Sequence, residues 1–114
     1  MDWIQLTGEQ QLDEIVEKSV DKPQVIFKHS TRCSISSVAM QRLNKGKLPE
    51  DIDFYHLDLI SYRNVSNKIA QKFGVNHESP QVLIIKNGQC IYDESHLGIS
   101  LDDITEQAQA SVNI

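Results

Sequence analysis

Cysteine is scarce in this chain, which has only Cys33 and Cys90 among its 114 residues. Two cysteines are too few for a disulfide scaffold and too few for a zinc site built on thiolates. Long apolar runs are also missing. The longest one, residues 82–85, falls far short of the roughly 20 residues that a membrane span needs. We therefore expect an ordinary apolar core, no metal site and no membrane partner.

Basic and aromatic residues are few as well. Lys and Arg number 11 against 16 Asp and Glu, which gives a net charge of −5, and aromatic residues make up 6% of the chain. This balance argues against nucleic acid and anionic lipid as partners. The first four residues show no basic segment and no apolar stretch, so no secretory signal is expected. With so few cysteines, the natural location is cytoplasmic.

The spacing of apolar residues predicts an alternation of strands and helices. Strands are expected at 3–6, 24–28, 52–59, 81–85 and 89–92. Thr7 and Gln10 have the spacing of a capping box for the first helix, Cys33 opens the second, and Ser61 and Ser100 can cap the last two. Apolar side chains of the second helix, predicted to face the core, are Ile35, Val38, Ala39 and Leu43.

The resulting order of elements, β-α-β-α-β-α-β-β-α, predicts one α/β domain spanning residues 1–114. Strand–helix alternation implies parallel pairing, and the Asn87-Gly88 turn implies a closing antiparallel hairpin. We expect a mixed sheet of four or five strands with helices on both faces. The thioredoxin-like fold has this order, although other small α/β folds share it.

Cys33 is the candidate nucleophile because it follows a predicted buried strand and opens a helix. Unpaired N–H groups and the helix dipole favour the thiolate there, so the pKa should lie below the usual value. Arg32, Lys28 and His29 are close in sequence and could add favourable charge. Cys33 read alone is more often a small buried side chain, but the strand–loop–Cys–helix context favours the reactive interpretation.

The motif at this position is CxxS, since Ser36 lies one helical turn after Cys33. Without a second cysteine, such a site cannot close its own disulfide. Its expected chemistry is attack on a mixed disulfide, followed by resolution by another thiol.

The dipeptide Ser79-Pro80 is the second candidate feature. A proline directly before a buried strand fits a turn in which the preceding peptide bond can be cis. In the thioredoxin fold a cis-proline loop lies beside the cysteine, and the residue before the proline offers backbone groups to substrate. The alternative is an ordinary trans proline that begins a strand.

A family resemblance is carried by residues 27–36, which read Phe-Lys-His-Ser-Thr-Arg-Cys-Ser-Ile-Ser. The segment resembles the site of the YtxJ-like monothiol bacilliredoxins, thioredoxin-fold proteins of bacteria that use bacillithiol. Residues 78–81 and 86–88 also look like this family, so the resemblance covers nearly the whole chain. Ser34 stands where the family usually has Pro, which restores a backbone donor near the sulfur.

By this resemblance, Cys33 removes bacillithiol from S-bacillithiolated cytosolic proteins, and a low-molecular-weight thiol or another protein thiol regenerates it. Bacillithiol is then a thiol co-substrate, and no cofactor is bound. Ser36 and Arg32 are implied as supporting groups at the catalytic thiol. Substrate contacts are implied for Ser34, Ile35, Ser79 and Pro80.

Two other functions remain open from the sequence. The domain can be a binding module that holds a partner in the proline-loop groove without turnover. It can also be a monothiol glutaredoxin-like iron–sulfur carrier, although the Cys-Gly-Phe-Ser site of such proteins is absent. Cys90, in the returning strand of the hairpin, is predicted to be structural. The four histidines show no ligand spacing, so no metal is expected.

Overall fold

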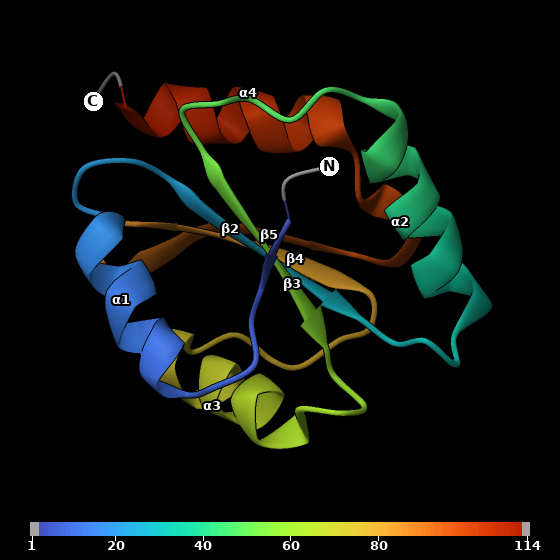
Figure 1. The fold of residues 1–114 in the computed structure, drawn as a ribbon. Coiled ribbons are helices and arrows are strands. Elements are labelled where there is room, and N and C mark those ends of the chain that lie inside the picture. Colours follow the sequence, from blue (N-terminus) through green and yellow to red (C-terminus); the bar gives the residue numbers. More distant parts are fainter. Residues whose placement is uncertain (1–2, 113–114) are drawn as a thin grey trace.

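A five-stranded mixed sheet forms the centre of the molecule (Figure 1). The computed structural model describes residues 3–112. The strands are β1 (Ile4–Gln5), β2 (Gln24–His29), β3 (Asp53–Asp58), β4 (Gln81–Lys86) and β5 (Gln89–Ser95). Their order across the sheet is β1-β3-β2-β4-β5, in which β1, β3 and β2 are parallel. The last two strands pair in antiparallel fashion, β4 with both β2 and β5.

Four helices cover the two faces of this sheet. They are α1 (Gln10–Lys18), α2 (Ser34–Lys45), α3 (Arg63–Phe73) and α4 (Leu101–Val112), and a short 3₁₀ helix, η1 (His96–Gly98), follows β5. Figure 1 shows α1 and α3 on one side of the sheet and α2 and α4 on the other. The predicted mixed α/β architecture with helices on both faces is confirmed.

Each face of the sheet has its own apolar core. Leu12 of α1 and Ile69 of α3 pack on one face, and Leu43 of α2 and Ile104 of α4 pack on the other. Strands β2 and β4 are apolar along most of their length because both of their faces are covered. A fully buried residue such as Leu83 contributes roughly 1.5–3 kcal/mol through the apolar surface that it removes from water.

The start of the first helix differs from the prediction. The helix begins at Gln10 with Glu9 as its N-cap, and no side chain caps it. The predicted capping box of Thr7 and Gln10 is wrong because Gln11, one position further along, reaches back instead. Its Oε1 accepts hydrogen bonds from the backbone N–H groups of Thr7 at 2.7 Å and Gly8 at 3.0 Å.

The predicted cap at Ser61 is also wrong. Tyr62 is the N-cap of α3, and the Ser61 hydroxyl donates to Asp58 Oδ2 at 2.9 Å. The turn residues, in contrast, behave as expected. Gly74 ends α3 with a φ of 66°, and Asn87 and Gly88 join β4 to β5 with φ values of 54° and 75°.

The strand register decides which loops meet. Lys28 on β2 pairs with Gln81 on β4, and Gln81 pairs with Ser95 on β5. The loop that follows β2, the loop that precedes β4 and the segment that follows β5 therefore leave the sheet at the same end.

Candidate active site

Three segments meet at this end of the sheet: the loop that leads to Cys33, the loop that contains Ser79 and Pro80, and η1. The carbonyl oxygen of Pro80 accepts a hydrogen bond from His96 N–H at 3.0 Å, which ties the proline loop to η1. The structure thus places both sequence-predicted features, the cysteine and the Ser-Pro dipeptide, at one end of the sheet.

Cys33 is the N-cap residue of α2, with an extended backbone (φ −109°, ψ 120°) before the first helical residue, Ser34. The turn before it is closed by two hydrogen bonds. Cys33 N–H donates to Ser30 O at 3.1 Å, and Ser30 N–H donates to Ser36 Oγ at 3.2 Å. These bonds fix the half-buried thiol at the point where the unpaired N–H groups of the helix emerge.

The surroundings of the sulfur favour the thiolate. The pKa of the Cys33 thiol is lowered, first by the backbone N–H of Ser36 and further by the Ile35 N–H and the Ser36 hydroxyl, while desolvation opposes them. No cap hydrogen bond of standard geometry is formed, as expected for a neutral thiol, which is a weak acceptor. Because Ser36 Oγ accepts from Ser30, its own proton remains available to the sulfur.

Ser36 therefore has two tasks at this site, closing the loop and supporting the thiolate, and its side chain is fully buried. Arg32 is exposed and forms no hydrogen bond or ion pair with any residue in the range 3–112. Its supporting role stays a prediction. Ser34 is exposed on the first turn of α2, beside the sulfur-bearing residue.

The outer face of α2 is more apolar than predicted. Ile35 is 38% exposed and Val38 is 41% exposed, so the prediction that both face the core is wrong. The inward stripe is formed by Ser36, Ala39 and Leu43, which follow helical spacing. Ile35 and Val38 lie off this stripe, and they leave apolar surface next to the cysteine, where a substrate contact is predicted.

The peptide bond between Ser79 and Pro80 is cis, one of the two readings that the sequence allowed. Pro80 is buried. Ser79 Oγ is shielded from solvent, and among the described residues it has no hydrogen-bond partner. A buried hydroxyl without a partner costs free energy, so a ligand group that bonds to it would relieve this cost.

His29 does not stand alone at the end of β2. Its Nδ1 lies 2.9 Å from His56 Nε2, and His56 Nδ1 lies 3.1 Å from Gln5 Oε1. Because Gln5 Oε1 can only accept, His56 donates through Nδ1, and its Nε2 accepts from His29 Nδ1–H. The pKa of each imidazole is lowered mainly by burial, so both rings are held neutral. This pairing joins residues 27 positions apart, and sequence spacing gave no sign of it.

The burial of Lys28 and its contact with His77 are what sequence reasoning missed, since it considered Lys28 only as a charge close to Cys33 in sequence. Its side chain is fully buried, and Nζ lies 3.3 Å from His77 Nδ1. Burial lowers the pKa of the Lys28 ammonium to about 8. A lysine inside an otherwise apolar strand was the available signal, because a lone buried ammonium is costly and therefore needs an explanation.

Cys90 lies away from this end. It pairs with Ile85 next to the hairpin turn, whereas the site adjoins the Gln81 end of β4. Burial raises the pKa of the Cys90 thiol, and its Sγ lies 3.3 Å from Tyr92 O. The structure supports a packing role for Cys90 and places this residue out of reach of Cys33.

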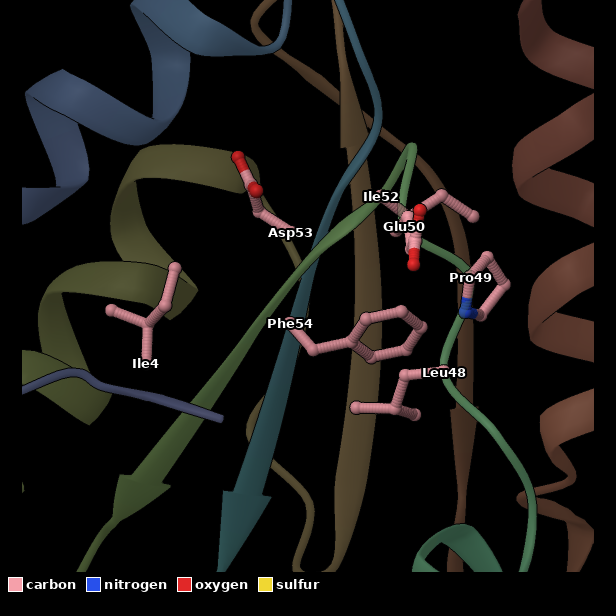
Figure 2. A pocket seen from close by; sticks show the side chains of 7 residues that line it. All are labelled: Ile4, Leu48, Pro49, Glu50, Ile52, Asp53 and Phe54. Carbon is pink, nitrogen blue, oxygen red and sulfur yellow. The ribbon is translucent and has the colours of Figure 1, made fainter. Parts of the chain in front are cut away.

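A surface pocket of about 440 Å³ lies elsewhere, at the opposite end of the sheet (Figure 2). Its lining residues are Ile4, Leu48, Pro49, Glu50, Ile52, Asp53 and Phe54. Asp53 pairs with Gln24, the first residue of β2, whereas Cys33 follows the last residue of that strand. The pocket is therefore separate from the cysteine site.

Two further observations concern metal and membrane. Within residues 3–112, no three His, Cys, Asp or Glu side chains come together as metal ligands. Each helix in that range is too short or too polar to span a bilayer.

Comparisons with solved structures define the class of protein. A protein described as having a thioredoxin fold is 32% identical, with a TM-score of 0.80 and coverage of 91% of each chain. A thioredoxin of Malassezia sympodialis (15% identity, TM-score 0.74, 96% of this chain and 90% of that one) shows the same fold. So does the thioredoxin pre-protein of Schistosoma mansoni (17% identity, TM-score 0.74, 97% and 99%). The chain has the predicted thioredoxin fold, with one cysteine at the site.

The family is shown by a sequence model. The model of the monothiol bacilliredoxin BrxC matches residues 4–104. The chain therefore belongs to the monothiol bacilliredoxin family, as the motif around Cys33 predicted, and its function is thiol–disulfide redox chemistry.

Proposed function

We propose that this protein removes bacillithiol from S-bacillithiolated proteins by monothiol exchange at Cys33. The observation that carries the proposal is the position of Cys33. It caps α2 with a lowered pKa and has Ser36, not a second cysteine, one turn later. Such a site can accept a small thiol but must pass it on.

The first step is attack of the Cys33 thiolate on the bacillithiol sulfur of the mixed disulfide. The bond between bacillithiol and the substrate protein breaks, and the protein thiolate leaves and takes a proton from water. A new disulfide joins Cys33 to bacillithiol. The number of disulfide bonds is unchanged, so the step needs no external oxidant or reductant.

The second step regenerates the enzyme. A free low-molecular-weight thiol, as thiolate, attacks the bacillithiol sulfur on Cys33, and the Cys33 thiolate leaves. The Ser36 hydroxyl and the N–H groups of the first turn of α2 stabilise that leaving thiolate as they stabilise the attacking one. The product is a small-molecule disulfide. Because the cycle needs reduced thiols, we place it in the cytoplasm.

Substrate contact is proposed for the surface around the sulfur. Ser34 and Ile35 expose their side chains on the first turn of α2, and the Ser79 hydroxyl, before Pro80, has no partner within residues 3–112. The partners in this proposal are thus S-thiolated cytosolic proteins and a low-molecular-weight thiol.

The test uses a protein substrate that carries bacillithiol on one cysteine. We expect the wild-type protein to release it and to gain the mass of one bacillithiol. The Cys33→Ser variant should do neither, while the Cys90→Ser variant should retain both properties. Release without an adduct on Cys33 would contradict the mechanism.

The same assay separates this function from the alternative of a binding module. A binding module would hold the thiolated protein without releasing bacillithiol, and Cys33→Ser would bind it as well as the wild type does. Turnover beyond one equivalent when bacillithiol is supplied excludes that alternative.

A further inference from the structure

The buried Lys28 sets the state of a second side chain near the site, His77. The ammonium group of a protonated lysine can donate hydrogen bonds but cannot accept them. Lys28 therefore donates to His77 Nδ1, 3.3 Å away. Ser66 Oγ, from α3, lies 3.3 Å from the same nitrogen. With Nδ1 occupied as an acceptor, the neutral imidazole of His77 must carry its proton on Nε2.

The Nε2–H group of His77 remains free to bond within the described part of the chain. His77 is an exposed residue, and Nε2 makes no hydrogen bond within the described part of the chain. His77 precedes Pro80 in the loop that leaves the sheet beside the Cys33 loop.

Two cations and one carboxylate act on His77. The positive charges of Lys28 on β2 and Arg63 on α3 lower the pKa of His77, and the carboxylate of Glu78, its neighbour in the loop, raises it. Burial, the largest effect, also lowers the pKa of His77. Burial disfavours an added charge of either sign, whereas the two cations favour an anion over a cation at this place. No carboxylate among residues 3–112 forms an ion pair with Lys28.

We propose that His77 recognises a carboxylate of the small thiol through its Nε2–H group, and that the buried Lys28 is the positioning residue that fixes this tautomer. This inference rests on the proposed function, because the small thiol is the one transferred to Cys33. It adds a chemical feature of that thiol, a carboxylate that His77 recognises.

The test compares mixed disulfides of one cysteine peptide with three small thiols: 3-mercaptopropionate (anionic), 2-mercaptoethanol (neutral) and cysteamine (cationic). The measured quantity is kcat/KM for the anionic substrate divided by that for the neutral one. A hydrogen bond to a charged group supports roughly a tenfold preference. We expect His77→Phe and Lys28→Met to lower this ratio about tenfold from its wild-type value.

The matched control is Lys86→Met, a lysine of β4 at the opposite end of the sheet, whose Nζ donates to Val20 O. It should keep the wild-type ratio. If His77→Phe and Lys28→Met slow all three substrates equally, the two residues merely hold the loop and the inference is wrong. An unchanged ratio in both variants also overturns it.

The pH dependence gives a second readout. Since the pKa of Lys28 is about 8, the wild-type ratio should fall as the pH rises through 8, and the Lys28→Met ratio should stay flat. The thiolate fraction of Cys33 cancels in the ratio. A flat wild-type profile counts against the role of Lys28.

Failure of the proposed function is recognised separately. If none of the three substrates is exchanged, exchange at Cys33 is refuted. Carboxylate binding by His77 is then measured without any exchange reaction. For this we use imidazole NMR of Cys33→Ser protein titrated with 3-(methylthio)propionate. The inference is supported if the chemical shift of His77 Nε2 changes with 3-(methylthio)propionate and not with the neutral control, 2-(methylthio)ethanol. No such change overturns it.

Discussion

Replacing Lys28 by methionine should stabilise the protein at neutral pH. Burial moves the pKa of Lys28 from 10.5 to about 8, which means that the folded protein disfavours the charged ammonium. At roughly 1.4 kcal/mol per pH unit, this is a penalty of about 3 kcal/mol when the lysine is charged in both states. The variant also loses the hydrogen bond to His77, which costs about 1 kcal/mol. We therefore expect its free energy of unfolding to be about 2 kcal/mol higher than that of the wild type at pH 7.

The penalty should depend on pH in a defined direction. Below pH 8 the lysine is protonated in the folded and unfolded states, and the full penalty applies. Between pH 8 and 10.5 the unfolded state binds more protons, so the stability of the wild type rises with pH. The advantage of Lys28→Met should therefore shrink by about 3 kcal/mol across this interval.

The assay is urea unfolding of both proteins, in reducing buffer, at several pH values from 7 to 10.5. Taking the difference between the two proteins cancels the titration of cysteines and tyrosines that they share. Lys86→Met is the control, since Lys86 is half-exposed and should show no such dependence. Parallel stability curves, or a less stable Lys28→Met protein at pH 7, would refute the reasoning.

Three other substitutions test the site and the fold. Ser36→Ala should raise the pKa of Cys33, since it removes a donor to the sulfur, and should slow exchange at neutral pH; thiolate absorbance near 240 nm measures the titration. An unchanged titration would deny the Ser36 hydroxyl its role, because the backbone N–H remains in the variant. Cys90→Ser should leave the exchange rate within about twofold, because the thiol lies at the far end of β4–β5, and a large loss would assign it a function. Gly74→Ala should cost about 1 kcal/mol in urea unfolding, as φ is 66° and no atom lies within 4 Å of an added Cβ; a neutral result would contradict the strain argument.

Local chemistry explains which parts of the fold could be predicted. The Asn87-Gly88 turn and the Gly74 stop follow from backbone preferences that act over a few residues. The predicted caps at Thr7 and Ser61 were wrong for the opposite reason. Several polar side chains lie near each helix start and can pair in more than one way. Gln11 accepts from the N–H of Thr7, and the Ser61 hydroxyl donates to Asp58 instead of capping α3.

The site was predictable only along the chain. A cysteine that opens a helix, with a serine one turn later, already implies a stabilised thiolate, and the structure adds how Ser30 and Ser36 close the loop. The exposure of Ile35 on the same turn was not predictable, since it depends on how α2 is rotated against the sheet.

The amino-acid sequence by itself determined the element order, the single site cysteine and the family motif around it, because these depend on residue type and short spacing. Only the tertiary structure decided that Lys28 meets His77, 49 residues later, and that Cys90 lies far from the site. Contacts of this kind depend on strand register, which the packing of the whole sheet fixes. The two cysteines differ in chemistry because Cys33 is the N-cap residue of a helix, whereas Cys90 lies half-buried beside a hairpin.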